Sequence, residues 1–258
     1  MADVLFGDPD LDAYGANLVM AHKFDDGSGS LTDSTGNGYD GAVTGSLTYH
    51  YTPAMNNYAV SMDNTAVANC GAIGGAVFPT QEFTSAGWYR LDNTGQTYYY
   101  LYTAANLTDP YFRLRCRTDG GGVVYFDGGG KFGGNCLART CPEISDYDWH
   151  LIVITRDTSN VYKLYIDNVY KGPSWFPGAS SPNGRTWRFF TSRSDDTVTG
   201  EMYGGKMDEV WLWNALLDAD ALTALWNGGS GQFLEVFQES HLSCLRDTRT
   251  NKLTQVDA

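Results

Sequence analysis

Residues 204–213 read Gly-Gly-Lys-Met-Asp-Glu-Val-Trp-Leu-Trp, and this stretch does most to decide the fold. Its apolar and aromatic residues favour a strand, in which Met207, Val210 and Leu212 can face a core. Shortly afterwards, the carboxylate of Asp218 can cap a helix over residues 219–226, and Asn227-Gly-Gly can end it. No other segment stands out as a helix, so we expect a mostly β protein with one short helix near its C-terminus.

On the N-terminal side of this stretch, short segments rich in aromatic and β-branched residues recur along the chain. They are residues 18–24, 58–62, 83–90, 97–102, 111–116, 123–126, 149–156, 161–166 and 185–190. The segments 149–156 and 161–166 flank a turn and predict a hairpin with one buried face. Many short strands with a single helix favour an all-β jelly-roll sandwich of two antiparallel sheets over alternating α/β layers.

The ends of the chain differ in composition from its body. Residues 1–15 are rich in Asp and Gly and predict an N-terminal arm, whereas residues 16–228 form the predicted jelly-roll domain. Residues 229–258 form a C-terminal extension in which Phe233, Val236 and Phe237 recur at helical spacing. We expect the N-terminal arm to be able to lie on a neighbouring subunit, and the C-terminal extension to pack on its own domain or on a partner.

Charge, hydropathy and cysteine spacing exclude several classes of partner and of metal site. The net charge of −13 opposes a phosphate backbone, so we expect no nucleic-acid partner. The N-terminal residues lack the basic and apolar regions of a signal peptide, and no stretch approaches the roughly 18 apolar residues of a membrane span. The five cysteines match no zinc-binding spacing. Free thiols are favoured, with a bridge from Cys116 to Cys136 or Cys141 as the alternative.

Taken in order, several stretches resemble the laminin-G-like branch of the concanavalin A-like lectin/glucanase superfamily. They are Lys23-Phe-Asp-Asp-Gly-Ser-Gly29, Asp33-Ser-Thr-Gly-Asn-Gly-Tyr-Asp-Gly41, Phe83-Thr-Ser-Ala-Gly-Trp-Tyr-Arg90, the hairpin of residues 149–168, and residues 205–214 with the helix that follows. The resemblance covers about residues 18–228 and implies a concanavalin A-like jelly roll. Residues 91–148 are longer and more glycine-rich than the family pattern.

The resemblance also implies a structural calcium ion between the opening loop and the last core strand. The matching residues are Asp25, Asp33, Asn37 and Asp208. Ca²⁺ takes about six to eight oxygen ligands, and a glycine-rich turn allows backbone carbonyls to join the carboxylates. In the alternative interpretation, Asp33 stabilises a turn and Asp208 accepts backbone hydrogen bonds, with no ion bound.

Glucanases of this superfamily make catalysis a hypothesis to test. A retaining glycosidase needs two carboxyl groups about 5–5.5 Å apart. The acids of residues 143–148 stand in the wrong order for this arrangement, and the adjacent Asp208 and Glu209 are expected on opposite faces of a strand. The four histidines are scattered without metal-binding spacing. We therefore predict that the protein is not an enzyme.

Carbohydrate binding is the function that the fold suggests, since aromatic rings stack on the apolar faces of sugars. The candidate residues for this role are Tyr98, Tyr100, Trp175 and Trp187. Alternate members of the run from Tyr98 to Tyr102 must face the core of a strand, so packing in a core or an interface is the alternative.

Three functions are weighed. The first is a virion structural protein, such as a phage capsid-decoration, head-fibre or tail-associated subunit, which forms a homo-oligomer, contacts neighbouring subunits and displays a lectin-like domain at the virion surface. It is motivated by the arms, the acidity and the missing export signal. The second is a secreted, extracellular carbohydrate-binding lectin module. The third, a glucanase relative, is disfavoured because no carboxylate pair fits.

Overall fold

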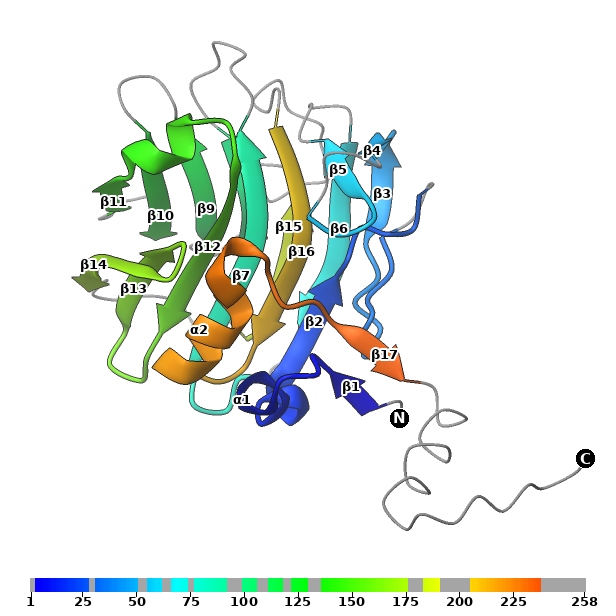
Figure 1. Ribbon diagram of the computed structural model, residues 1–258, viewed down its shortest axis with the longest axis horizontal. Coiled ribbons are helices and arrows are strands. Elements are labelled where there is room, and N and C mark those ends of the chain that lie inside the picture. The colour runs from blue at the N-terminus through cyan, green and yellow to red at the C-terminus, as the bar shows by residue number, and fades with distance from the viewer. Residues whose placement is uncertain are drawn as a thin grey trace, which may run out of the picture.

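A computed structural model describes most of the chain. The described residues are 3–27, 31–50, 55–61, 66–73, 77–91, 99–105, 111–117, 122–129, 136–175, 183–190 and 205–237. They form two large antiparallel sheets that pack face to face, with a short helix near the C-terminal end (Figure 1). The predicted fold class is confirmed.

The first sheet has seven strands. In spatial order they are β11 (Cys136–Thr140), β10 (Val123–Gly129), β9 (Tyr111–Arg117), β8 (Tyr99–Ala105), β15 (Arg185–Phe189), β6 (Ala66–Ile73) and β3 (Ala42–Gly45). The sequence predicted β8, β9, β10 and β15 within a few residues of their ends. It did not predict β3, β6 or β11, because these segments lack the aromatic and β-branched runs that marked the others.

The second sheet has eight strands. In order they are β14 (Val169–Trp175), β13 (Val161–Ile166), β12 (Trp149–Arg156), β7 (Phe83–Leu91), β16 (Gly205–Trp213), β5 (Ala59–Ser61) and β4 (Tyr49–His50), while β2 (Leu18–His22) pairs with β16 beside β5. The expected hairpin is β12–β13, with Ile154 opposite Leu164. The last long strand of the sequence, β16, lies at the centre of this sheet.

The main core lies between the two sheets. Leu114 and Val124 from the seven-stranded sheet belong to one buried cluster with Ile152 and Ile154 from the eight-stranded sheet. Each of these side chains is at most 1% exposed. Successive residues of a strand point to opposite faces, so these positions also fix which residues of β9, β10 and β12 face outward.

A second core covers the outer face of the eight-stranded sheet. Trp88, Trp211 and Trp213 lie there beneath the helix α2 (Ala219–Trp226) and the short helix α1 (Pro9–Asp12). As predicted, α2 is capped by Asp218, which accepts a hydrogen bond from the Ala221 N–H at 2.9 Å. It ends at Asn227 in the left-handed conformation, with φ 45°. Three short 3₁₀ turns, residues 15–17, 142–145 and 227–229, complete the helical elements of the described chain.

Both ends of the described chain belong to this second core. The N-terminal segment folds back on its own domain, with Phe6 and Leu11 at most 1% exposed, and therefore does not extend to a neighbour at these positions. Its strand β1 (Asp3–Leu5) pairs with β17 (Glu235–Phe237) (Figure 1). The helical spacing noted around Val236 is therefore misleading, because these residues form a strand. Residues 238–258 of the extension lie outside the described residues.

Three of the five cysteines have described side chains, and all three are free and buried. They are Cys70, Cys116 and Cys141. Burial raises the pKa of Cys141 to about 11 and raises that of the other two further, which disfavours the reactive thiolate. The expectation of free thiols is thus confirmed for these residues, while the Cys136 side chain and Cys244 lie outside the described part. No helix in the described ranges is long and apolar enough to cross a membrane.

Candidate functional site

The strand β16 contains a β-bulge at its two consecutive acids. Asp208 pairs with Trp88 and Trp211 pairs with Ala86, so β16 carries one residue more than β7 between these pairs. Glu209 takes up the difference with a positive φ of 47°. The opposite residue is Gly87, where a Cβ atom would lie 2.8 Å from the Tyr89 hydroxyl and 2.9 Å from a methyl group of Val210. Only glycine fits opposite this bulge.

Because of the bulge, the two carboxyl groups converge instead of pointing apart. Asp208 Oδ2 accepts the backbone N–H groups of Met55 and Asn56, each at 2.9 Å. The Asn56 side chain donates to Glu209 Oε1, also at 2.9 Å. Both acids are 0% exposed. The predicted placement of Asp208 and Glu209 on opposite faces is wrong, since that expectation assumes unbroken alternation.

The carboxyl pair is buried with part of its hydrogen-bonding capacity unused. Within the described chain, Asp208 Oδ1 and Glu209 Oε2 have no hydrogen-bond partner. Burial and the neighbouring Glu209 raise the pKa of Asp208 to about 9, and burial raises the pKa of Glu209 to about 8. Two such groups without further ligands hold protons at neutral pH. A bound cation would have the opposite effect and favour the ionised forms.

Asp25 is a third carboxylate, near enough for its charge to act on both acids. It accepts the Tyr58 backbone N–H at 3.1 Å and the Asn57 side-chain amide at 3.2 Å. The Lys23 ammonium lies 3.6 Å from it. The segment that contacts Asp208 and Glu209 therefore also contacts Asp25, and the charge of Asp25 contributes to the raised pKa of both acids.

Asp33 and Asn37 form a separate, saturated turn against β2. The Asn37 side chain donates to the backbone carbonyl of Val19 at 2.9 Å. The Asp33 carboxylate accepts hydrogen bonds from the backbone N–H groups of Ala21, Thr35 and Tyr39 and from the Thr35 hydroxyl. The turn interpretation of Asp33 is confirmed. The four predicted calcium ligands do not form one site, and no group of three His, Cys, Asp or Glu in the described ranges is arranged to hold a metal ion.

The predicted sugar-stacking residues lie in different parts of the structure. Trp187 is 1% exposed in the main core and meets Phe83 edge to face, so its predicted contact with a sugar is wrong. Tyr100 lies on β8 opposite Arg115, and Trp175 lies at the end of β14 opposite Val161, but neither side chain belongs to the described part. Tyr98 lies outside the described residues.

The outer face of the seven-stranded sheet collects polar and aromatic positions. Leu114 and Cys116 of β9 face the core, so the intervening Arg115 lies on the outer face. The register places Tyr100 on one side of Arg115 and Tyr125 on the other. A neighbouring cross-strand row runs through Asn69, Arg188, Thr103, Arg113 and Asp127. Arginine and tyrosine are residue types that sites for hydroxyl-rich ligands use.

His150 is held by two carboxylates. Its Nδ1 lies 2.6 Å from Asp167 Oδ2, and its Nε2 lies 2.9 Å from Asp146 Oδ1. Burial lowers the pKa of His150, but these hydrogen bonds outweigh burial and raise the pKa to about 9. With both ring nitrogens engaged and the proton held, His150 stabilises the fold and is not available as a general base.

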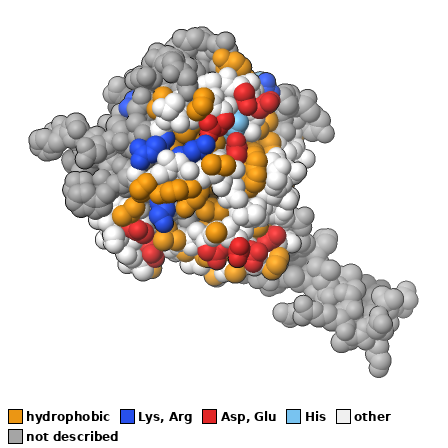
Figure 2. Space-filling model, turned by 60° about the vertical axis from the view of Figure 1, so that its left-hand side comes forward, with side chains coloured by type: hydrophobic (Ala, Val, Ile, Leu, Met, Phe, Trp, Pro, Cys, Tyr) orange, Lys and Arg blue, Asp and Glu red, His pale blue; other side chains and the backbone are white. Residues whose placement is uncertain are grey.

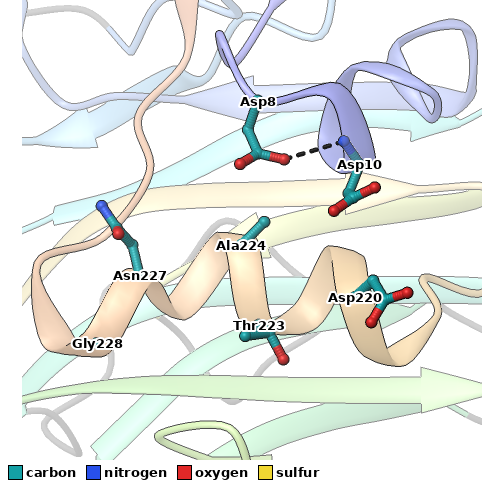
Figure 3. A pocket seen from close by; sticks show the side chains of 7 residues that line it. All are labelled: Asp8, Asp10, Asp220, Thr223, Ala224, Asn227 and Gly228. Carbon is teal, nitrogen blue, oxygen red and sulfur yellow. Dashed lines mark hydrogen bonds between the residues drawn. The ribbon is translucent and has the colours of Figure 1, made fainter.

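An open pocket of about 380 Å³ lies between α1 and α2 (Figure 3). Its lining includes the carboxyl groups of Asp8, Asp10 and Asp220 and contains no aromatic or basic side chain. Asp8 is the N-cap of α1, and its carboxylate accepts a hydrogen bond from the Asp10 N–H at 2.9 Å. The acidic lining disfavours anions, and without a ring the pocket has no stacking surface for a sugar.

Comparison with known proteins identifies the family. The profile of a family described as "Concanavalin A-like lectin/glucanases superfamily", Laminin_G_3, matches residues 62–223, which is more than half of the chain. The chain belongs to the concanavalin A-like lectin/glucanase superfamily. The sequence resemblance is thereby confirmed. No curated protein sequence matches the chain significantly.

Solved structures of the same fold include carbohydrate-associated and toxin domains. Domain 4 of AbnA, an extracellular arabinanase from Geobacillus stearothermophilus in complex with arabinotriose, matches with a TM-score of 0.58 at 16% identity, covering 80% of this chain and 97% of that domain. The binding domain of botulinum neurotoxin DC in complex with rat synaptotagmin II matches with a TM-score of 0.61 at 11% identity, covering 83% of this chain. The chain spans about half of that toxin domain, 52%. The binding domain of the same toxin in complex with SialylT matches with a TM-score of 0.59 at 13% identity, covering 82% of this chain and 51% of that one. At these identities the likeness establishes the fold.

Within this superfamily member, the calcium expectation fits only part of the predicted set. The charge of Asp25 acts on Asp208, and the partnerless oxygens of Asp208 and Glu209 are hard donors of the kind that Ca²⁺ prefers. Glu209 was not among the predicted ligands. A signal was present in the two consecutive acids that interrupt an otherwise apolar strand, because acids buried in a strand need a partner.

Proposed function

We propose that this protein is a non-catalytic glycan-binding domain that uses the outer face of its seven-stranded sheet. The observation that carries the proposal is the position of Arg115 on that face, between Tyr100 and Tyr125 in the register. A guanidinium group donates hydrogen bonds to sugar hydroxyls, and tyrosine is a residue type that stacks on the C–H faces of sugars. Fold neighbours bound to arabinotriose and to SialylT support the same ligand class.

The described acids and histidine support a binding role over catalysis. Asp208 and Glu209 are adjacent but 0% exposed, so a glycan on the surface cannot reach them. His150 has both ring nitrogens bound to carboxylates. A glycosidase needs its acid and its nucleophile on both sides of an accessible glycosidic bond.

A glycan-array screen followed by calorimetry tests this proposal. We expect the full chain to bind a defined set of glycans and Arg115→Ala to weaken that binding about tenfold, the loss expected for a charged hydrogen bond. Asp220→Asn, in the pocket beside α2, is the control and should bind like the parent. The proposal is contradicted if no glycan binds, or if Arg115→Ala binds as tightly as the control while both remain folded.

We further propose that the paired carboxyl groups of Asp208 and Glu209, whose second oxygens lack partners, hold a structural calcium ion, with the charge of Asp25 nearby. When bound, the ion would neutralise carboxylates whose burial otherwise favours their protonated forms. The Asn56 and Met55 N–H groups orient the Asp208 carboxylate and leave its second oxygen for a ligand. The role is structural, because Asp208 and Glu209 are 0% exposed.

A second candidate function is display on an assembly, such as a phage virion surface, by a homo-oligomer in contact with neighbouring subunits. The pairing of β1 with β17 favours it, since both ends of the described chain leave from one edge and can serve as one attachment point (Figure 1). Light scattering on the full chain and co-sedimentation with particles test this role. A defined oligomer that sediments with particles supports it, whereas a glycan-binding monomer supports the secreted, extracellular lectin.

A further inference from the structure

The outer face of the hairpin β13–β14 carries an aromatic pair, of which Tyr170 is exposed and Tyr165 is partly buried against the second core. Tyr165 and Tyr170 face each other in the register, with ring centroids 5.4 Å apart and planes inclined at 45°. Tyr170 is 49% exposed and the adjacent Val169 is 55% exposed, and they are the large apolar side chains exposed in the described part of the chain. Such a pair offers a flat apolar surface to a ligand.

This surface is held rigidly. The hairpin turns at Asp167 and Asn168, both with positive φ, as in a tight two-residue turn. Asp167 accepts the Leu151 backbone N–H at 3.0 Å, and Asn168 donates to the Thr223 hydroxyl of α2 at 3.0 Å. A ligand therefore meets a surface that is already ordered, and binding costs little conformational entropy.

The edge of this hairpin is closed to another strand. Arg139 of β11 donates to the backbone carbonyls of Lys171 and Pro173 on β14. Pro173 also lacks an N–H group, so it cannot pair. A partner that adds a β-strand is thus disfavoured, and recognition must use the side chains on the outer face.

One basic group lies beside the rings. Lys163 is exposed and stands two residues before Tyr165 on the same face of β13, roughly 7 Å along the strand. It has no ion pair in the described chain, whereas Lys171 on the same hairpin is paired with Glu143. In a chain of net charge −13, an unpaired ammonium group beside an apolar platform complements an anionic ligand. Figure 2, in which the β13–β14 side is turned forward, shows basic side chains next to apolar ones.

We propose that Tyr165, Tyr170 and Lys163 form a second sugar subsite, selective for a pyranose that bears a carboxylate. The apolar face of the sugar ring lies on the tyrosines, and the carboxylate binds the Lys163 ammonium. Lys163 and Tyr165 are two residues apart on one face of β13, so a single residue of a glycan can contact both. This inference rests on the proposed glycan-binding function but uses the other sheet, away from Arg115.

Calorimetry with the full chain and two matched trisaccharides tests the subsite. The probes are trigalacturonate and its neutral counterpart galactotriose. We expect Lys163→Gln to weaken trigalacturonate binding about tenfold, since a charge-assisted hydrogen bond is lost, and to leave galactotriose binding unchanged. Tyr170→Ala should weaken the binding of both sugars. Lys171→Gln is the matched control, because it removes a charge from the same hairpin but the Lys171 ammonium is already paired with Glu143. This variant should change neither affinity.

The outcomes separate this inference from the proposed function. If Arg115→Ala abolishes trigalacturonate binding while Lys163→Gln and Tyr170→Ala leave it intact, the hairpin subsite is overturned and the proposed function stands. Binding that depends on Tyr170 and Lys163 but not on Arg115 supports the hairpin subsite and overturns the proposed role of the seven-stranded sheet. Equal effects of Lys163→Gln and Lys171→Gln overturn the selectivity for a carboxylate. Because Lys163 and Tyr170 are exposed, unchanged thermal melts will show that the variants are folded.

Discussion

Asp33 and Asp208 are both buried aspartates that accept backbone hydrogen bonds, yet their surroundings differ. Asp33 is 4% exposed, and its carboxylate is surrounded by N–H groups of its own turn and of β2 and by the Thr35 hydroxyl. Asp208 is 0% exposed, accepts two hydrogen bonds on one oxygen and has none on the other. It also lies beside Glu209, a second buried acid with a partnerless oxygen.

The difference shows that burial alone does not mark a functional carboxylate. A buried acid whose hydrogen bonds are complete stabilises a turn. A buried pair with unused oxygens needs a proton or a cation, because two ionised carboxylates in such surroundings repel each other. Four predictions test this difference, in order of decreasing expected effect.

The largest expected effect is on the turn. We expect Asp33→Ala to lower the free energy of unfolding by about 3 kcal/mol, because it leaves buried backbone N–H groups without an acceptor. Urea denaturation measures this loss. Asp208→Asn is the matched comparison, since an amide oxygen can still accept the N–H groups of Met55 and Asn56, and it should cost much less without calcium. Similar losses in the two variants would remove the distinction between the sites.

The next effect is the response to calcium. With free calcium about a hundredfold above its Kd, we expect stabilisation of roughly 2.7 kcal/mol, seen as a higher melting temperature. The shift should be larger at pH 8 than at pH 6, because calcium competes with the protons that burial keeps on Asp208 and Glu209. Asp208→Asn should abolish the shift. A melt that EDTA and added calcium leave unchanged would contradict the proposed ion.

The third prediction concerns Glu209→Gln in EDTA. In contrast to Asp33→Ala, this variant should have a higher free energy of unfolding than the parent, by a smaller amount. The pKa of Glu209 is raised to about 8 in the folded state, so the folded protein binds more protons than the unfolded chain, and stability falls as pH rises from about 4.5 to 8. A neutral glutamine removes this loss and should stabilise the protein at pH 9 by about 1 kcal/mol. Denaturation curves at pH 5 and pH 9 provide the test, and a variant that is less stable at pH 9 would refute the explanation.

The smallest effect concerns His150, whose contribution has the same pH direction for a different reason. Its folded-state pKa is raised from 6.5 to about 9, so its stabilising effect is complete below pH 6.5 and is lost as pH rises through 9. We expect His150→Gln to be less stable than the parent at pH 6 and to approach it at pH 10. Combining this variant with Glu209→Gln should flatten the pH dependence further, and an unaltered slope would exclude His150 as a source.

Much of the fold was predictable because its signals are local. The aromatic and β-branched runs identified β7, β12, β13 and β16 within a residue or so, and the cap at Asp218 identified α2. Strands such as β6 and β3 were missed because their propensity is weak and sheet pairing sets their conformation. The ends of the chain were misjudged for a similar reason, since Phe6 becomes a core residue only when Trp211 and Trp213 are in place.

The sequence by itself determined the superfamily, the two-sheet architecture and the acidic character of the protein, because these follow from composition and from motifs read in order. Only the tertiary structure decided which carboxylates meet. The bulge at Glu209 shifts the alternation of β16 by one residue, which brings Glu209 beside Asp208, while Asp33 is hydrogen-bonded to β2. Tertiary packing likewise buried Trp187 and exposed Tyr170. A ring has the same local propensity on either face of a strand, so only the partner sheet decides which rings a ligand can reach.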